Sequence, residues 1–292
     1  MVHSEHRQRL VDLLRAEQVA QVQELCLALG GVDLQGTDLS GIDLHALDLH
    51  RACLRSTFMC GTRLVGAVLS EADLSDARLQ DVVLRDARLD GACLRGARLH
   101  SVDLSSASLK GACLAGLVNL AGNRTDLSGA CLSGADLTRA RLTGIDLSGA
   151  DLTRATLVGA VFIGASFRGA DLTGADLTDA DLEGADLEGA RLAGANLQRA
   201  CLRNAVLEQS VLAGADLRGA RLRGADLTGA DLTHAQLQGA ELFRAFLNNA
   251  CLIGADLTDA DLKRVELYGV VCGLQTRWPA GFEPSAHGGT VG

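Results

Sequence analysis

Aromatic residues are scarce in this chain of 292 residues: they make up 3% of the sequence, and prolines number only two. A core built from this composition must use leucine and alanine in place of aromatic anchors. Lysine is almost absent as well, since Lys110 and Lys263 are the only two, so nearly all positive charge is arginine. The formal net charge of −9 disfavours non-specific binding to nucleic acid and leaves open a protein partner with a basic surface.

Long apolar runs are also missing. Mean hydropathy is +0.18, yet charged residues interrupt every few positions, and no run approaches the ~18 apolar residues of a membrane span. The N-terminal stretch MVHSEHRQRL has no apolar segment of a signal peptide. We expect a cytoplasmic protein that does not enter a membrane.

Cysteines number nine, which is odd, and no CxxC pair occurs. This pattern indicates a reducing compartment, not a disulfide framework. Six cysteines share one position of the repeat described next: Cys53, Cys93, Cys113, Cys131, Cys201 and Cys251. The spacing of Cys93 and Cys113 within that repeat admits a redox or metal pair, or simply two small residues in equivalent places.

Leucine recurs every fifth residue over most of the chain. One series runs from Leu34 to Leu114 and a second from Leu127 to Leu267, giving 46 centres, of which only Met59, Phe162 and Phe167 are not leucine. Counting from each centre, position −2 is small or β-branched, usually alanine; Leu47 is the larger exception. We therefore treat centre and −2 as one inward pair.

A period of five fits neither regular secondary structure. On a helix, successive leucines would be rotated by about 140° and would ring the helix. On a continuous strand, an odd spacing would send alternate leucines to opposite faces. A chain that turns a corner every five residues satisfies the pattern, with about 20 residues in a four-cornered coil and coils stacked ~4.8 Å apart.

Glycine use supports such corners. Position +2 is glycine at 18 of the 29 repeats of the second series. Glycine adopts positive φ at little cost, but the other 11 sites are Arg, Asp, Asn, Gln or His. We therefore expect a mixture of turn types.

Tandem A(D/N)LxG units, such as ADLTG at 170–174 and ADLEG at 180–184, resemble the pentapeptide-repeat family over roughly residues 32–271. The resemblance implies an all-β solenoid, a right-handed quadrilateral β-helix. It also implies a non-catalytic protein. Some members, the quinolone-resistance and antibiotic self-immunity proteins, are DNA mimics that occupy the DNA-binding surface of bacterial gyrase.

Both ends of a stack of coils need covering. Residues 4–29 favour one or two helices, so 1–31 is predicted to be an N-terminal helical cap, with a dimerisation or partner-binding helix as the alternative. Residues 272–292 are predicted to form a C-terminal cap and tail, because Trp278 and Phe282 gather there with both prolines. The coils would then occupy 32–114 and 127–271.

The two leucine series are out of phase, because the step from Leu114 to Leu127 is not a multiple of five. Strict register would place Asn119 and Arg124 inside, which we expect the core to reject. Residues 115–126 are therefore predicted to hold a register break, either a tolerated insertion or a contact loop presenting Leu117, Asn119, Asn123 and Arg124.

Motifs of catalysis and cofactor binding are lacking. No GxxxxGK[ST] phosphate loop occurs, and the seven histidines lack zinc-ligand spacing. DADLEG at 179–184 matches the first half of a calcium loop, but Ala190 stands where a bidentate glutamate belongs. We predict a protein with no catalytic residues, no metal and no cofactor.

Charge is the remaining signal. Seven acids occupy about one coil with no base among them: Asp171, Asp176, Asp179, Asp181, Glu183, Asp186 and Glu188. A further set lines up on one face at every second coil: Asp136, Asp176, Asp216 and Asp256. These acids either keep a rod in solution or form a partner surface.

The functional hypothesis is a protein-interaction rod. With the resemblance, the candidate partner is DNA gyrase or topoisomerase IV, bound through these acids without direct contact to nucleic acid and protected from, or modulated against, antibiotics that poison it. A homodimer is compatible with the same resemblance. The alternative is a generic scaffold or regulatory binding protein with no DNA-enzyme partner.

Overall fold

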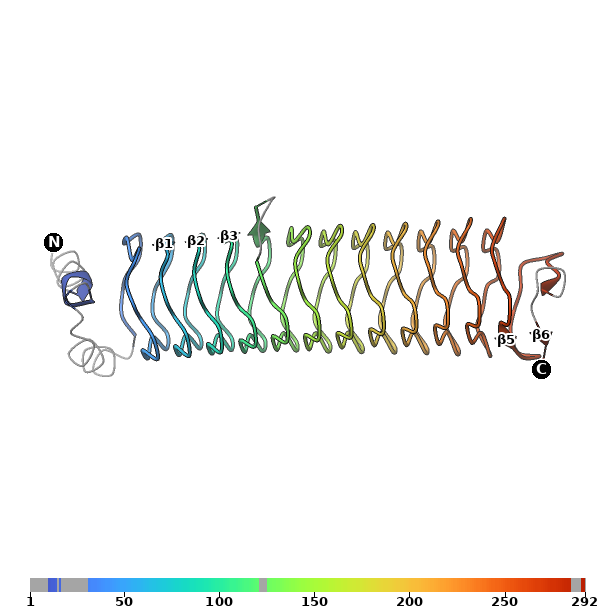
Figure 1. The fold of residues 1–292 in the computed structure, drawn as a ribbon, viewed down its shortest axis with the longest axis horizontal. Coiled ribbons are helices and arrows are strands. Elements are labelled where there is room, and N and C mark those ends of the chain that lie inside the picture. Colours follow the sequence, from blue (N-terminus) through green and yellow to red (C-terminus); the bar gives the residue numbers. More distant parts are fainter. Residues whose placement is uncertain (1–9, 15, 17–30, 121–124, 285–289, 292) are drawn as a thin grey trace. The chain divides into compact units, whose positions relative to one another are not determined.

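The computed structural model describes residues 10–14, 16, 31–120, 125–284 and 290–291. The chain divides into two compact units, Met1–Arg141 and Leu142–Gly292. In each unit the described chain winds through successive coils (Figure 1). Below, these are the first and the second unit.

Residues 10–14 are helical, and Leu10, Val11 and Leu14 in this segment are buried. The remainder of the helical cap expected over 1–31 lies outside the described residues, apart from 16 and 31. Within the described part of the chain, no helix has the length and apolar character needed to cross a membrane.

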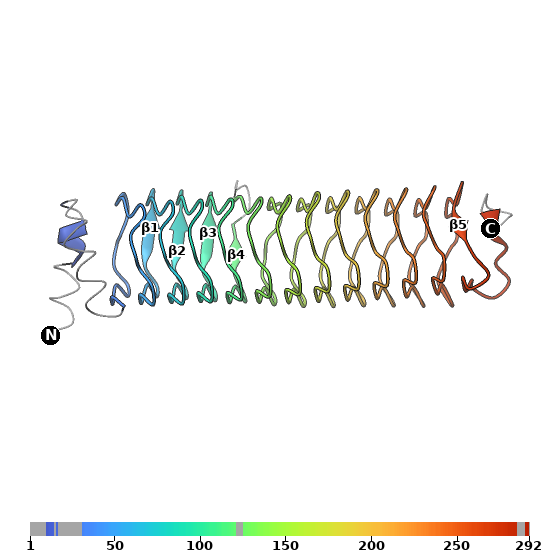
Figure 2. The same cartoon turned by 90° about the horizontal axis from the view of Figure 1, so that it is seen from below.

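Four short parallel strands show how the coils stack. The sheet follows chain order: β1 (Phe58–Cys60), β2 (Arg78–Gln80), β3 (Arg98–His100) and β4 (Val118–Asn119). Figure 2 shows these strands side by side in the first unit. Leu79 pairs with Met59 and with Leu99, so each residue meets its equivalent one coil away. The usual offset is 20 residues, as between Arg51 and Glu71, so one coil contains four repeats.

Within each unit, backbone hydrogen bonds tie successive coils together. The N–H of Leu172 donates to the carbonyl of Arg191 at 2.7 Å, and the N–H of Asp171 donates to the carbonyl of Ala150 at 2.9 Å. A turn is closed where the N–H of Ala175 donates to the carbonyl of Leu172 at 3.0 Å. The backbone polar groups of a structure with almost no regular strand are satisfied in this way.

Leucine at the centre and alanine at −2 point inward, as predicted. The coil that carries the seven acids from Asp171 to Glu188 is here called the acidic coil. Its four centres are all 0% exposed: Leu172, Leu177, Leu182 and Leu187. The two aromatic centres, Phe162 and Phe167, are also fully buried. The interior is therefore a set of stacked side-chain ladders that contributes most of the hydrophobic stabilisation.

Corner geometry corrects one prediction. Position +2 has a positive φ in every described repeat from Gly36 to Gly269, whether or not the residue there is glycine. The prediction that the corners would have a mixture of turn types was therefore wrong. The reason lies in the hydrogen bonding, because the +2 N–H must also reach the next coil: Arg154, with φ 55°, donates to the carbonyl of Thr173 at 3.0 Å.

One coil of the first unit is longer than the others. Asp103 pairs with Asp126, and the N–H of Val102 donates to Thr125 Oγ1 over 23 residues. The extra length comes after Asn119, which stays in register opposite Leu99 and is 8% exposed. The expectation that the core would reject Asn119 was therefore wrong. Its backbone holds it there, since its N–H donates to the carbonyl of Arg141 at 2.8 Å.

The second unit ends with a modified coil. Cys272, in β5 (Val271–Cys272), takes the place of a central leucine and is 1% exposed. β5 pairs in parallel with β6 (Thr290–Val291). Asp256 bridges Arg277, which places Trp278 at a central position, where its ring stacks on Phe282 at 5.3 Å between centroids.

Candidate partner-binding surface

Each side of the acidic coil carries one aspartate at position −1. These aspartates accept a hydrogen bond from the backbone N–H two residues later, which closes a local turn. The distances are 3.0 Å for Asp171, 3.0 Å for Asp176, 3.2 Å for Asp181 and 3.1 Å for Asp186. Aspartate at this position therefore has a structural role whether or not it meets a partner.

Arginines from neighbouring coils neutralise part of this charge. Arg168 contacts Asp186 at 3.0 Å and Glu188 at 2.6 Å. Arg191 lies 3.5 Å from Asp171, and Arg199 lies 2.8 Å from Asp179. The coil contains no base in the sequence, but the fold brings bases to it from the coils before and after.

Asp176, Asp216 and Asp256 lie on one side of the second unit, joined through bridges to Asn196 and Gln236 between them. Asp136 belongs to the first unit, where it accepts the N–H of Thr138 at 2.9 Å.

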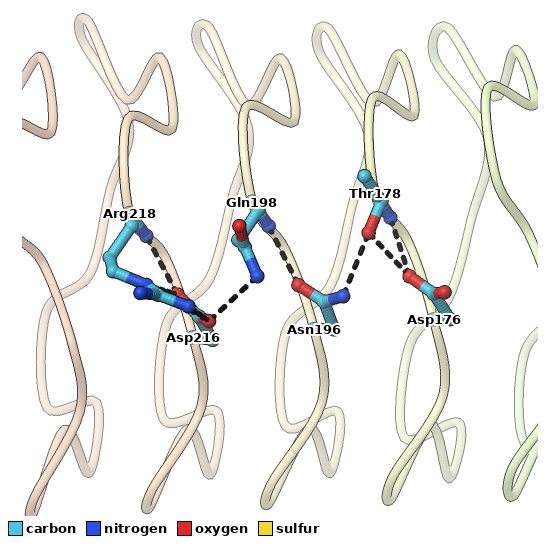
Figure 3. Close-up of polar contacts among 6 residues, drawn as sticks. All are labelled: Asp176, Thr178, Asn196, Gln198, Asp216 and Arg218. Atoms are coloured by element: carbon cyan, nitrogen blue, oxygen red, sulfur yellow. Dashed lines mark hydrogen bonds and ion pairs between the residues drawn. The ribbon is translucent and has the colours of Figure 1, made fainter.

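This side is a polar hydrogen-bonded ladder (Figure 3). The Asn196 amide donates to Thr178 Oγ1 at 2.8 Å, and the Gln198 amide donates to Asp216 Oδ2 at 2.9 Å. Arg218 closes on Asp216 at 2.6 Å. The aspartates of this side are thus held by the protein's own donors.

Two of these carboxyls have a pKa below the usual aspartate value. Partial burial raises the pKa of Asp216, but the side chain and backbone N–H of Arg218 outweigh it. Burial likewise raises the pKa of Asp256, and hydrogen bonds from Thr258 and Gln238 with the charge of Arg277 reverse the shift. Both groups are charged at neutral pH and bound internally, so this side is a poor place for a partner's cations.

A different group of acids is crowded. Asp186, Glu188, Glu208 and Asp226, here called the acidic patch, come from three successive coils of the second unit. The charge of Asp226 raises the pKa of Glu208 above its usual value, with burial and the charge of Glu188 adding to the effect. Glu208 and Asp226 are not among the site residues predicted from the sequence. The signal was available, since side chains at +1 and at −1 of the next coil meet 18 residues apart, as Arg168 and Asp186 do.

The half-matched calcium motif does not form a loop site. Asp179 occupies a corner and pairs with Arg199, while Asp181 and Glu183 lie beside Cys201, with one ligand atom of each within 4.8 Å. Burial raises the pKa of the Cys201 thiol, which disfavours the thiolate that a metal would need. This donor set gives no reason to assign a metal.

The predicted contact loop is only partly described. Leu117 is 0% exposed and Asn119 is 8% exposed, so neither side chain faces outward as a contact loop would require. Leu120 is 44% exposed. The candidate residues Asn123 and Arg124 lie outside the described residues.

Comparison with known proteins agrees with the repeat pattern. Residues 28–116 and 122–270 match the description of pentapeptide repeats. One similar solved structure is that of HetL, a pentapeptide repeat protein involved in heterocyst differentiation regulation from the cyanobacterium Nostoc sp. strain PCC 7120. HetL is 32% identical in sequence to this chain. The match covers 85% of this chain and 94% of HetL, with a TM-score of 0.31. No curated protein sequence matches the chain.

Two further solved structures are similar to this chain. A pentapeptide repeat protein from the Arabidopsis thaliana thylakoid lumen is 38% identical over 38% of this chain and 70% of its own, with a TM-score of 0.28. QnrB1, a plasmid-mediated fluoroquinolone resistance protein, is 18% identical over 82% of this chain and 93% of its own, with a TM-score of 0.35.

Proposed function

The chain belongs to the pentapeptide-repeat family, and we propose that it is a non-catalytic protein-binding scaffold that presents carboxylates to a basic partner surface. The specific partner we propose is a bacterial type II topoisomerase, DNA gyrase or topoisomerase IV. The acids would occupy the enzyme's DNA-binding surface in place of phosphates and so modulate its response to topoisomerase poisons.

The acidic patch is the observation that carries this proposal. The charge of Asp226, burial and the charge of Glu188 raise the pKa of Glu208, because neighbouring carboxylates disfavour its ionised form. A cationic side chain from a partner would relieve that repulsion. Binding of a basic surface would therefore stabilise the ionised form of the Glu208 carboxylate. The net charge of −9 adds attraction at longer range.

The test is a gyrase supercoiling assay with purified protein, with and without a fluoroquinolone. Inhibition of supercoiling, or rescue from the drug, at micromolar protein supports the proposal. The informative variant is Glu188→Lys with Glu208→Lys, because both lie at +1 and neither accepts a turn-closing backbone N–H among the described contacts. Replacement of Asp176, Asp181 or Asp186 would also remove such a bond and confound binding with folding.

A control is Asp259→Lys, which reverses an exposed carboxylate at a corner of the second unit outside the acidic patch. The proposal predicts that the double variant at the acidic patch loses the gyrase effect while the control retains it. An unchanged effect in the folded double variant would contradict a role for the patch. Absence of any effect from the wild-type protein would favour a regulatory scaffold with another partner.

The remaining architectural expectations belong to the same proposal. We propose that the coils are right-handed and four-sided and that residues 1–31 cover the first coil. We also place the protein in the cytoplasm, where a bacterial topoisomerase would be accessible to it.

A further inference from the structure

One side of the second unit carries opposite charges at its two ends. It consists of the outward residues of the repeats centred on Phe162, Leu182, Leu202, Leu222 and Leu242, here called the bipolar face. Backbone hydrogen bonds between successive coils fix the order of its +1 row. That row reads Ile163, Glu183, Arg203, Arg223 and Phe243. The −1 row reads Val161, Asp181, Cys201, Arg221 and Glu241.

The basic end is an arginine cluster around one ring. The Cζ atoms of Arg223 and Arg244 each lie 5.4 Å from the centroid of Phe243, and that of Arg264 lies 5.9 Å away. None of these three arginines has a carboxylate within ion-pair distance in the described chain, unlike Arg168 or Arg199. Guanidinium groups packed on a ring keep outward N–H groups that suit a carboxylate.

The acidic end lies two coils from Arg223 and three coils from Phe243. Asp181 and Glu183 belong to the acidic coil, and the described contacts contain no arginine or lysine ion pair for either of them. Next to them, Ile163 is 39% exposed, a large apolar side chain on the surface. The face thus runs from an apolar residue through two acids to arginines and a second large apolar residue.

We propose that two copies of this chain associate through the bipolar face, antiparallel, about a two-fold axis that passes over Cys201 and Arg203. Such an axis keeps each row opposite itself and reverses the order of coils. Glu183 then faces Arg223 of the second copy, and Asp181 faces Arg221. Ile163 faces Phe243, and each of these three pairs occurs twice. Val161 faces Glu241, and Arg203 meets its own copy on the axis, so four opposite-charge pairs outnumber one like-charge pair.

Shape complements charge in this register. The long Arg244 side chain faces Gly164 of the second copy, where no side chain occupies the corner. Gly184 faces Gly224. The two copies can therefore approach closely at the corner row while the arginines extend across the contact.

Other registers are worse. Sliding one copy by one coil so that the axis moves toward Phe243 sets Arg203 against Arg223 and Asp181 against Glu241, which places like charges together. Sliding it by one coil the other way moves Glu183 from Arg223 to Arg203 but sets Ile163 against Arg223. A parallel pair about an axis along the stack would set Asp181 against Glu183 and Arg221 against Arg223.

The contact is narrow. Five coils span only about 24 Å at a spacing of ~4.8 Å, so the area falls below the roughly 800 Å² per partner of a standard interface. The dimer should therefore be weak, with a dissociation constant in the micromolar range, and sensitive to salt. The acidic patch lies on a different side and stays free for the partner proposed above.

The test is sedimentation equilibrium of the full chain at low salt and at 0.5 M NaCl. These two salt concentrations are chosen to give about a threefold change in Debye length. We expect micromolar dimerisation at low salt and at least about tenfold weakening at high salt. Glu183→Arg and Arg223→Glu should each abolish the dimer. The double variant should restore it, because each new arginine faces a new glutamate. Arg154→Glu, a matched reversal at a corner outside the bipolar face, should leave dimerisation unchanged.

Three results would overturn the proposal. One is a wild-type monomer at 100 µM and low salt, about a hundredfold above a 1 µM dissociation constant. Another is a dimer that neither single reversal affects. The third is a double variant that stays monomeric with its circular dichroism unchanged. If the wild-type monomer instead binds heparin through Arg223, the arginines serve a polyanionic ligand and the dimer is rejected.

Discussion

The rings of Phe162 and Phe167 meet edge to face inside one coil, with centroids 5.1 Å apart and planes at 74°. They occupy adjacent centres where every neighbouring repeat has leucine, and both are 0% exposed. This coil fills its interior with two aromatic side chains, so the coils on either side must accommodate their extra volume.

Loss of one ring should leave a cavity that a stack of narrow coils cannot close. We expect Phe162→Ala to lower the free energy of unfolding by about 3–5 kcal/mol, as for other buried phenylalanines. Phe162→Leu restores the residue that the repeat uses elsewhere and should cost less than about 1.5 kcal/mol. Urea denaturation of both variants measures the difference, and equal losses would contradict the packing described here.

Arg154 tests the corner conformation. Its φ of 55° is in the left-handed region, which strains a β-branched residue most. Arg154→Val should destabilise by about 1–2 kcal/mol, whereas Arg154→Gly should be neutral or slightly stabilising. Thr153→Val at the neighbouring +1 position is the control and should have little effect. If both valine variants melt alike, the corner does not impose positive φ.

Glu208 should make stability fall as pH rises. Its pKa is raised in the folded state by the charge of Asp226, burial and Glu188, so ionisation is easier in the unfolded chain. The cost appears as pH rises through the ordinary glutamate pKa and persists at pH 7. Glu208→Gln should therefore raise the melting temperature at pH 7 and leave it unchanged near pH 3. A gain of equal size at both pH values would point to packing instead.

Asp216 should have the opposite pH dependence. Although burial opposes the shift, the Arg218 hydrogen bonds lower its pKa in the folded state. Its contribution is present above the ordinary aspartate pKa and is lost as pH falls through the lowered value. Asp216→Asn should destabilise at pH 7 and converge with wild type near pH 2.

The comparison variant is Asp146→Asn, since Asp146 accepts a turn-closing N–H from Ser148 at 2.9 Å but has no arginine within ion-pair distance in the described chain. Melting curves between pH 2 and pH 7 separate the turn, common to both residues, from the arginine contact. Parallel curves for the two variants would contradict a role for Arg218.

Leucine periodicity was enough to predict coils and the inward pair, because burial of leucine and alanine is repeated at every turn. It was not enough for the corners. The residue type at +2 varies between repeats, and Arg154 is one example. The backbone at this position nevertheless has a positive φ in every described repeat. Asn119 was misjudged because the prediction considered its side chain and not the hydrogen bonds that hold its backbone.

Charge was harder to read from sequence. Seven acids within about one coil suggested a belt of negative charge. Neighbours in space are 18 or 20 residues apart, so a count along the chain could not reveal that Arg168 pairs with Asp186 and Arg199 with Asp179. The same offset hid the proximity of Glu208 to Glu188. Once the coil length is known, these pairs can be found by writing the sequence in rows of one coil each.

Asp103 pairs with Asp126 over 23 residues, whereas the usual offset is 20. The first unit therefore accommodates one longer coil next to regular ones. Since consecutive regular coils meet through equivalent backbone bonds, deletion of 20 residues from a regular region of the second unit should rejoin compatible edges. Within the second unit, each added or removed coil should change the length by about 4.8 Å. Duplication or loss of one 20-residue coil would then change the length of this unit in steps, although side-chain pairs between coils, such as Arg168 with Asp186, would be re-formed with new partners or lost.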